Sequence, residues 1–349
     1  MMGPVHAGRG RRGLGLDASM PASRLGRRRD WLVGGGLLVA LLAAVTYTVG
    51  WQALLAPWRT LSPSLIVALV AMSVASYLLR ALRFYDYFRP RLAGRFPSLL
   101  RLTVLHNTAN NLLPMRAGEL VFPWLMRRYF GHGLLDAMAA LLWVRLLDLH
   151  LLALAGLWIL SQAAPSQLWL AVMVLWLALL VPLAAVGRIG ALRRAKEGDK
   201  RVLQLLATIA AAAPTRPVAV ARLYLLTALI WGLKLAAFAI LLRHFVPVDV
   251  WRVLSGVIGA ELSSVLPFHG IAGAGSYEAA AVAALVPLGV DPALALSGAV
   301  NLHLFLLGVT LLLALSAPLL PAAGARPGRA TRRGRDRQSS LGCPAEDQQ

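Results

Sequence analysis

Long apolar runs separated by short polar or basic segments dominate the hydrophobic pattern of this chain. A helix needs about 20 mostly apolar residues to cross the core of a bilayer. The runs that meet this requirement are predicted to be full membrane spans, at residues 31–50, 64–82, 137–160, 168–186, 223–242 and 291–320. Two further apolar stretches, 99–129 and 251–287, are interrupted near the middle by Pro, Gly and polar residues. Since their halves are too short to cross alone, each is predicted to form a re-entrant helical hairpin.

The order of these elements predicts an all-α polytopic membrane protein with an internal symmetry. A span, a hairpin entering from the cytoplasmic side and a second span are followed by the same units in the opposite orientation. The two broken segments also resemble each other, since 107–119 and 263–278 both read as apolar residues, Leu-Pro, a Gly-containing turn and then Glu. Inverted-topology repeats built on broken helices are typical of secondary transporters. We therefore expect an inverted-topology repeat whose broken segments face each other and form the working site.

Composition supports the membrane class and changes how the charge is interpreted. The 349 residues are 58% hydrophobic and 14% charged, whereas soluble domains are about 25% charged. A net charge of +20 would suggest nucleic acid as a partner of a soluble protein, but here the basic residues cluster between the apolar runs. They are interpreted as topology signals and as attraction to anionic lipid headgroups, with no nucleic-acid partner. A single cysteine, Cys343, excludes an internal disulfide.

The basic clusters also predict the orientation and the domain boundaries. Residues 188–201 and both termini are expected in the cytoplasm, and the uncharged loop 161–167 is expected outside. Residues 1–30 and 321–349 are predicted to be disordered cytoplasmic tails that flank one transmembrane domain at 31–320. The expected location is the inner membrane of a bacterium.

Charged residues inside the apolar runs are the first candidates for a functional site, because each costs about 2.5–3.5 kcal/mol at the centre of a membrane helix. Arg145 and Asp148 are three residues apart and can pair on one helix face. They are either a structural ion pair, or Asp148 holds Arg145 towards a polar cavity. Arg116 offers a planar fork for a phosphate beside a helix expected to begin near Gly118. The alternative there is a turn stabilised by Glu119.

The second broken segment extends the candidate site. Its glycines superficially resemble a phosphate-binding loop, but no strand precedes them and no Lys-Ser/Thr follows, so close helix packing is the alternative. The predicted lipid- or substrate-binding residues are Asn107, Asn111, Arg116, Gly118, Glu119, Arg145, Asp148, Glu261, Gly273, Gly275, Glu278 and Asn301. Two arginines at the end of a predicted span, Arg80 and Arg83, are interpreted as interfacial anchors that gather anionic headgroups. No histidine pair has helical ligand spacing, and we expect no metal, cofactor or catalytic residue.

These residues resemble the lysylphosphatidylglycerol synthase transmembrane domain family, whose members are flippase-like. The likeness covers roughly residues 30–320 and rests on Arg80, Arg83, Asn107, Pro114, Arg116, Gly118, Glu119, Arg145 and Asp148, followed by Pro267, Gly273, Gly275 and Glu278. The second segment departs from the family's Pro-rich Gly-Gly-x-Gly form. In the namesake, the membrane half translocates aminoacylated phospholipid made by a fused cytoplasmic synthase. The 349 residues contain no synthase half, so a separate lipid-modifying enzyme is a possible partner.

The residues and the resemblance together predict a lipid translocase or transporter that binds a phosphate-bearing headgroup at a polar site near the membrane midplane. The expected partners are membrane lipids, either anionic or aminoacylated phospholipids or a polyprenyl phosphate. Two alternatives stay open. The chain could be a membrane enzyme acting on a polyprenyl-phosphate-linked sugar, with its carboxylates as acid or base, or a non-catalytic membrane partner of an envelope-synthesis enzyme.

Overall fold

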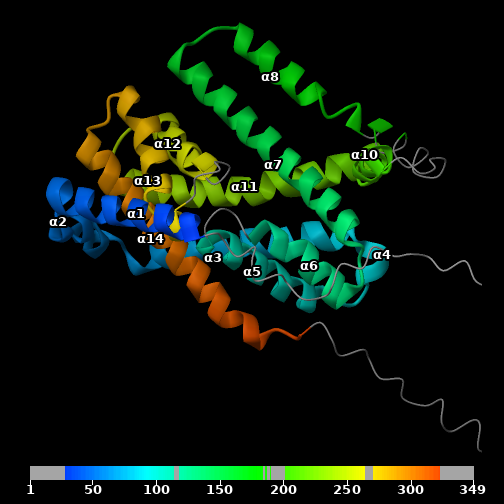
Figure 1. Cartoon of the computed structure of the whole chain (residues 1–349). Coiled ribbons are helices and arrows are strands. Elements are labelled where there is room, and N and C mark those ends of the chain that lie inside the picture. Colours follow the sequence, from blue (N-terminus) through cyan, green and yellow to red (C-terminus); the bar gives the residue numbers. More distant parts are fainter. Residues whose placement is uncertain are drawn as a thin grey trace, which may run out of the picture.

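The computed structural model describes residues 28–113, 118–183, 185–186, 189, 201–263 and 270–322, which form helices and turns without any strand (Figure 1). The predicted all-α class is therefore confirmed. Within these ranges, six helical segments are long and apolar enough to cross a membrane: Leu32–Val49, Pro63–Tyr87, Leu134–Ala163, Pro217–Phe245, Ile271–Leu288 and Pro292–Leu319. The chain is thus a multi-pass membrane protein.

The N-terminal half contains the helices α1 (Arg28–Ala44), α2 (Trp51–Leu55), α3 (Pro63–Tyr87), α4 (Arg89–Leu92), α5 (Phe96–Leu112), α6 (Gly118–Phe130), α7 (Leu134–Ala163) and α8 (Leu168–Ala178). The C-terminal half contains α10 (Arg201–Ala211), α11 (Pro217–Phe245), α12 (Val250–Ser263), α13 (Ser276–Leu285) and α14 (Pro292–Ser316). Short turns flank them: η2 (Val45–Val49), η3 (Ala56–Thr60), η5 (Ile271–Gly273), η6 (Val286–Leu288) and η7 (Ala317–Leu319). Polar caps define two of the long helices, since Ser62 accepts the Leu65 N–H before α3 and Asp291 accepts the Leu294 N–H before α14.

Five of these segments agree with predicted spans, and the sixth differs. The apolar run at 168–186 was predicted to cross the membrane, but α8 ends at Ala178 and residues 179–182 form turns. Pro182 favours this ending, because proline lacks the N–H that would continue the helix. In its place, Ile271–Leu288 has the length and composition of a span, although it was predicted as half of a hairpin.

Both broken segments lie between pairs of short helices that pack against each other. Helices α5 and α6 have 17 and 13 residues, and α12 and α13 have 14 and 10. At 1.5 Å per residue, even the longest of them measures about 25 Å. The helices of each pair are in contact with each other. Re-entrant insertion of these pairs and the inverted repeat remain predictions.

Among the buried apolar clusters that hold the described helices together, two are the largest. The larger core joins α3, α11, α12, α13 and α14 through buried side chains such as Leu69, Phe238 and Leu302. The smaller core joins the end of α3 to α5, α6 and the start of α7 through Phe84 and Phe122. Helix α8 contacts α7 and buries none of its own residues, so it extends away from both cores (Figure 1). Such an exposed apolar face is expected where a helix faces lipid.

Candidate functional site

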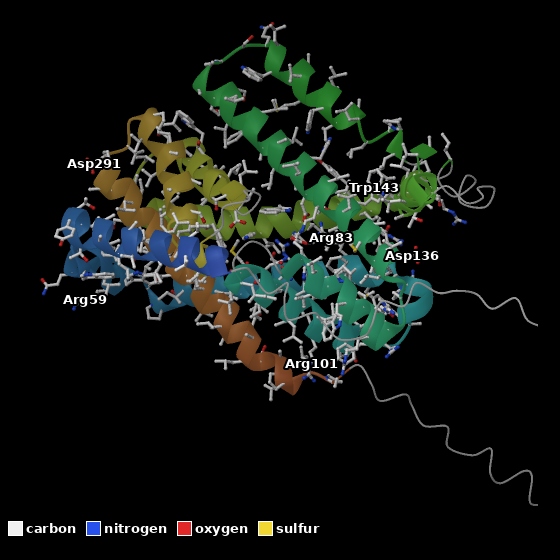
Figure 2. All side chains as sticks on the ribbon, in the orientation of Figure 1. Arg59, Arg83, Arg101, Asp136, Trp143 and Asp291 are labelled. Atoms are coloured by element: carbon white, nitrogen blue, oxygen red, sulfur yellow. The ribbon has the colours of Figure 1, made fainter. Side chains whose placement is uncertain are left out.

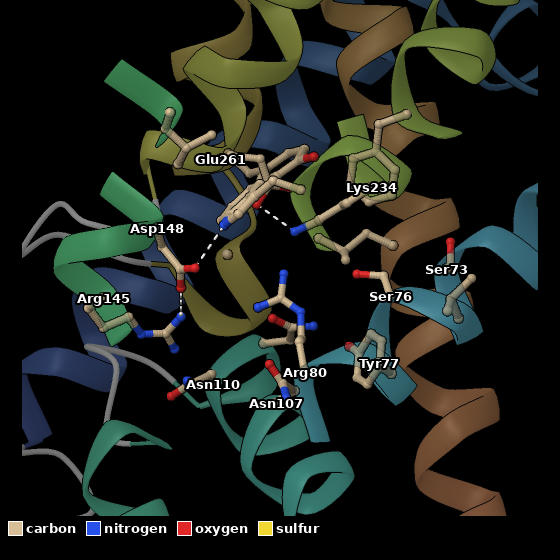
Figure 3. Close-up of a pocket in the computed structure, with 18 of the residues that line it drawn as sticks. Ser73, Ser76, Tyr77, Arg80, Asn107, Asn110, Arg145, Asp148, Lys234 and Glu261 are labelled. Carbon is tan, nitrogen blue, oxygen red and sulfur yellow. Dashed lines mark hydrogen bonds and ion pairs between the residues drawn. The ribbon is translucent and has the colours of Figure 1, made fainter. Parts of the chain in front are cut away.

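A cavity of about 220 Å³ with many polar lining residues lies beside the larger core, where the described parts of both broken segments meet (Figure 3). The end of α5 contributes Asn107, Asn110 and Asn111, which precede the first break. Ala272 and Gly273 contribute from η5, after the second break, and η5 packs against α5. The described parts of the two broken segments therefore share one cavity.

The carboxylate of Asp148 is held by three helices beside this cavity. Its Oδ1 accepts a hydrogen bond from Arg83 Nη1 at 2.6 Å and from Trp231 Nε1 at 3.0 Å. Its Oδ2 lies 3.4 Å from Arg145 Nη1, so the pairing expected within α7 is present. The nearest cation, however, is Arg83 on α3, which also donates to Thr227 Oγ1 at 2.7 Å. Buried pairs of this kind are costly to break because one charge is left without compensation.

Arg83 is buried between helices, whereas its place at the end of a predicted span suggested an exposed position. Its side chain is 1% exposed and is enclosed by α3, α7 and α11. Figure 2 shows Arg83 in the interior of the bundle, whereas Arg59 and Arg101 lie towards its periphery. An acid 65 positions later in the chain compensates its charge inside the protein. The role of Arg83 as an interfacial anchor stays a prediction.

Arg145 makes its closest ion pair with a different carboxylate. Its Nη2 lies 2.8 Å from Glu119 Oε1, and its Nε donates to the same oxygen at 3.1 Å. Asn110 Nδ2 also donates to Glu119 Oε1, at 3.3 Å. Glu119 thus joins α5 and α6 to α7 and fixes the direction of the Arg145 guanidinium, which lines the cavity.

A third ion pair closes the opposite side of the cavity. Lys234 Nζ on α11 lies 2.5 Å from Glu261 Oε2 on α12. The ammonium also lies over two aromatic rings, 5.3 Å from the centre of Trp231 and 5.1 Å from that of Phe238. These contacts offset part of the cost of placing an ammonium at this depth.

Arg80 is the cation that differs from the others. It is 7% exposed, and Figure 3 shows its guanidinium directed into the space between the Asp148 and Lys234 sides of the cavity. Its Cζ lies 5.5 Å from the centre of the Trp231 ring. Among the residues that the structure describes, it makes no hydrogen bond and no ion pair. The predicted role of Arg80 as an interfacial anchor also stays a prediction, and the structure adds that its side chain is buried and lines the cavity.

A hydrogen-bonded pair shapes the wall formed by η5. Glu278 is 2% exposed, accepts the Gly275 N–H at 2.8 Å and lies 2.6 Å from His303 Nδ1. His303 Nε2 lies 2.9 Å from the Ala272 carbonyl oxygen. Gly273 and Gly275 have φ angles of +81° and +85°, which glycine adopts without strain. Glu278 and Gly275 therefore act on the site by positioning η5.

The remaining predicted residues divide into lining and structural positions. Asn107 and Asn111 line the cavity. A Cβ atom on Gly118 would lie 2.4 Å from the Asn110 backbone nitrogen, so glycine allows α6 to begin directly against α5. Asn301 is fully buried outside the cavity, where it donates to the Leu54 carbonyl oxygen and accepts from Trp58 Nε1. Arg116 lies outside the described residues.

Sequence reasoning missed one polar face of α3 and did not include Lys234 among the predicted binding residues. Ser73, Ser76, Tyr77 and Arg80 all line the cavity, and their spacing of three, four and seven residues places them on one face of a helix. That spacing was readable from the sequence. In the described part of the chain, no group of three or more His, Cys, Asp or Glu residues could hold a metal ion.

Comparison with known proteins identifies one family. The family model described as lysylphosphatidylglycerol synthase TM region matches residues 31–314, a range that includes all the cavity-lining residues. No curated protein and no solved structure matches the chain.

Proposed function

The chain belongs to the family of the lysylphosphatidylglycerol synthase TM region, and from this premise we propose that it is a lipid translocase of the bacterial inner membrane. The family suggests a membrane protein in a lipid-related process. In our proposal, the central cavity receives the phosphate-bearing headgroup of a lipid near the membrane midplane, while the acyl chains stay in the bilayer.

The observation that carries this proposal is the environment of Arg80. A guanidinium that is almost fully removed from water loses much of its hydration, and a buried charge is normally paired. Among the described residues, Arg80 makes no ion pair or hydrogen bond, and its guanidinium lies 5.5 Å from the centre of the Trp231 ring. A phosphate would complete this site, because its oxygens match the planar fork of an arginine.

The edge of the cavity supports a lipid rather than a water-soluble anion. Leu146 and Leu149 on α7 line the cavity and remain 43% and 45% exposed. A headgroup at Arg80 could therefore remain joined to acyl chains that lie against these leucines. The volume of about 220 Å³ is below the 300–1,000 Å³ of typical pockets for drug-sized ligands, which fits a headgroup better than a whole lipid.

Movement of the headgroup would follow from the ion pairs that surround it. Arg83 and Asp148 join α3 to α7, Glu119 joins α6 to Arg145, and Lys234 joins α11 to Glu261 on α12. Each ion pair connects different helices. A movement of helices α5 and α6 relative to α12 and α13 would therefore open the cavity towards one side of the membrane and close it towards the other. This is the alternating access expected of proteins built on broken helices.

A proteoliposome assay tests the proposal. Purified protein is reconstituted with a fluorescent phosphatidylglycerol analogue, and a membrane-impermeant reductant destroys the fluorescence of the outer leaflet. We expect the wild type to expose the inner-leaflet lipid and Arg80→Gln to lose at least about 90% of that rate, whereas the matched variant Arg59→Gln, on the exposed turn η3, retains it. A wild-type rate equal to that of empty vesicles, or an unchanged rate in Arg80→Gln, would overturn the proposal.

A further inference from the structure

We infer that the cavity selects a headgroup with one net negative charge, namely a phosphodiester with a neutral, hydroxyl-bearing head, and disfavours headgroups that carry an ammonium group. This inference rests on the proposed lipid-binding function and names the substrate class of the same site. It departs from the aminoacylated phospholipid in the name of the matched family.

The inference starts from the balance of positive and negative charges among the described residues around the cavity. Four cations surround the cavity, namely Arg80, Arg83, Arg145 and Lys234. Three carboxylates compensate them, namely Asp148, Glu119 and Glu261. Among the described residues, one positive charge remains, and its position is Arg80, since the other three cations lie within 4 Å of a carboxylate oxygen.

The neighbouring Glu278 and His303 do not change this balance. His303 Nε2 faces a backbone carbonyl oxygen, which only accepts, so this nitrogen carries a proton. His303 Nδ1 and Glu278 Oε1 are 2.6 Å apart, which requires one proton between them. Whichever atom holds that proton, the two side chains together are neutral.

The three carboxylates already have cationic partners. Asp148 accepts from Arg83 and Trp231 and is also paired with Arg145, Glu119 pairs with Arg145, and Glu261 pairs with Lys234. An incoming ammonium would therefore approach the guanidinium of Arg80 and the ammonium of Lys234. Each of the three carboxylates that could attract it already has a cation beside it. Like charges repel more strongly in a partly buried site than in bulk water, so a second cation is disfavoured there.

Neutral polar groups surround the remaining positive charge. Ser73, Ser76 and Tyr77 lie on the same face of α3 as Arg80, and Asn107 faces them from α5 (Figure 3). Ser73 and Ser76 donate their hydroxyl protons to the carbonyl oxygens of Leu69 and Ile230, so their oxygens can accept from a ligand hydroxyl. A phosphomonoester, with a charge between about −1.5 and −2 at pH 7, would exceed the single positive charge, which favours a diester.

A competition experiment with the purified full-length chain tests this inference. Phosphatidylglycerol, phosphatidylethanolamine, lysyl-phosphatidylglycerol and a polyprenyl monophosphate are supplied in equal amounts in detergent, and the retained lipid is measured by native mass spectrometry. We expect the wild type to retain phosphatidylglycerol roughly tenfold over each competitor. Equal or greater retention of any competitor would overturn the inference.

Variants of Lys234 and Glu261 make the test independent of general loss of binding. Lys234→Gln removes the ammonium beside Glu261 and makes the cavity neutral, so we expect phosphatidylethanolamine to rise to at least parity with phosphatidylglycerol. The double variant Lys234→Gln/Glu261→Gln restores the single positive charge, so its preference for phosphatidylglycerol over phosphatidylethanolamine should exceed that of Lys234→Gln and return towards that of the wild type. If both variants keep the wild-type preference, or both lose it, the charge of the cavity does not set selectivity.

The proposed function and this inference can fail separately. If the wild type retains no lipid and exposes none in proteoliposomes, the proposed function is wrong. If it retains and exposes lipid with no preference for the monoanionic diester, only the inference about charge is wrong.

Discussion

Replacing Asp148 by leucine is the perturbation that most severely tests the arrangement of buried charges. The substitution removes the acceptor of Arg83 Nη1 at 2.6 Å and of Trp231 Nε1 at 3.0 Å. Arg83, with a side chain 1% exposed, would keep only the Thr227 hydroxyl as a described partner. Leucine is close to aspartate in size, so the main effect is on charge rather than on packing.

The expected magnitude follows from these contacts. Removing one partner of a buried ion pair costs about 3–5 kcal/mol, whereas replacing both partners by apolar residues of similar volume is often nearly neutral. Asp148→Leu and Arg83→Met should therefore each lower the free energy of unfolding by about 3–5 kcal/mol. The double variant should lose much less than the sum, which corresponds to a coupling energy of about 3 kcal/mol. Arg145→Met should cost less than either, because Asp148 would keep Arg83 and Glu119 would keep Asn110.

A double-mutant cycle in mixed micelles measures these values. Unfolding by increasing denaturing detergent can be followed by the fluorescence of the ten tryptophans, with each variant compared at the same lipid content. Additive losses in the double variant would refute the reasoning, because they would mean that Arg83 and Asp148 stabilise the fold independently. A larger loss in Arg145→Met than in Asp148→Leu would also contradict the assigned partners.

Three further predictions concern packing and topology. Gly118→Ala should destabilise the protein by about 1–3 kcal/mol in the same unfolding assay, because the added Cβ would lie 2.4 Å from the Asn110 backbone nitrogen. The control Gly156→Ala, with open space around it, should have no such cost. Asn301→Leu should cost about 1–3 kcal/mol through the loss of bonds to Leu54 and Trp58, but lipid retention should persist, and its loss would place Asn301 in the site. In a Cys343→Ser background, an impermeant thiol reagent should label a cysteine at Ser161 and not one at Gln338 in spheroplasts; labelling of position 338 would contradict cytoplasmic termini.

The sequence was most informative about elements that depend on local pattern. Apolar length alone located five of the spans, and it failed at 168–186 because Pro182 ends the regular helix inside a run that is apolar throughout. The pairing of Arg145 with Asp148 was predictable because three residues separate them on one helix.

Ion pairs between residues that are distant in the chain could not be predicted from the sequence. Arg83 and Asp148 are 65 positions apart, and Lys234 and Glu261 are 27 apart, so only the folded bundle brings them together. Arg80 and Arg83 were interpreted as anchors because basic residues at the end of a span usually mark the cytoplasmic interface. In this protein the helix continues to Tyr87, which keeps both arginines inside it. The polar face of α3 was the signal that could have indicated their burial.

The central claim is that Arg80 binds the phosphate of a lipid inside the bundle. The most direct measurement is an experimental structure of the protein extracted in native membrane lipid, without detergent exchange. The account predicts headgroup density in the cavity, with phosphate oxygens within hydrogen-bonding distance of the Arg80 guanidinium and acyl density leaving past Leu146 and Leu149. Lipid density confined to the outer surface, with Arg80 paired to a protein carboxylate, would contradict it.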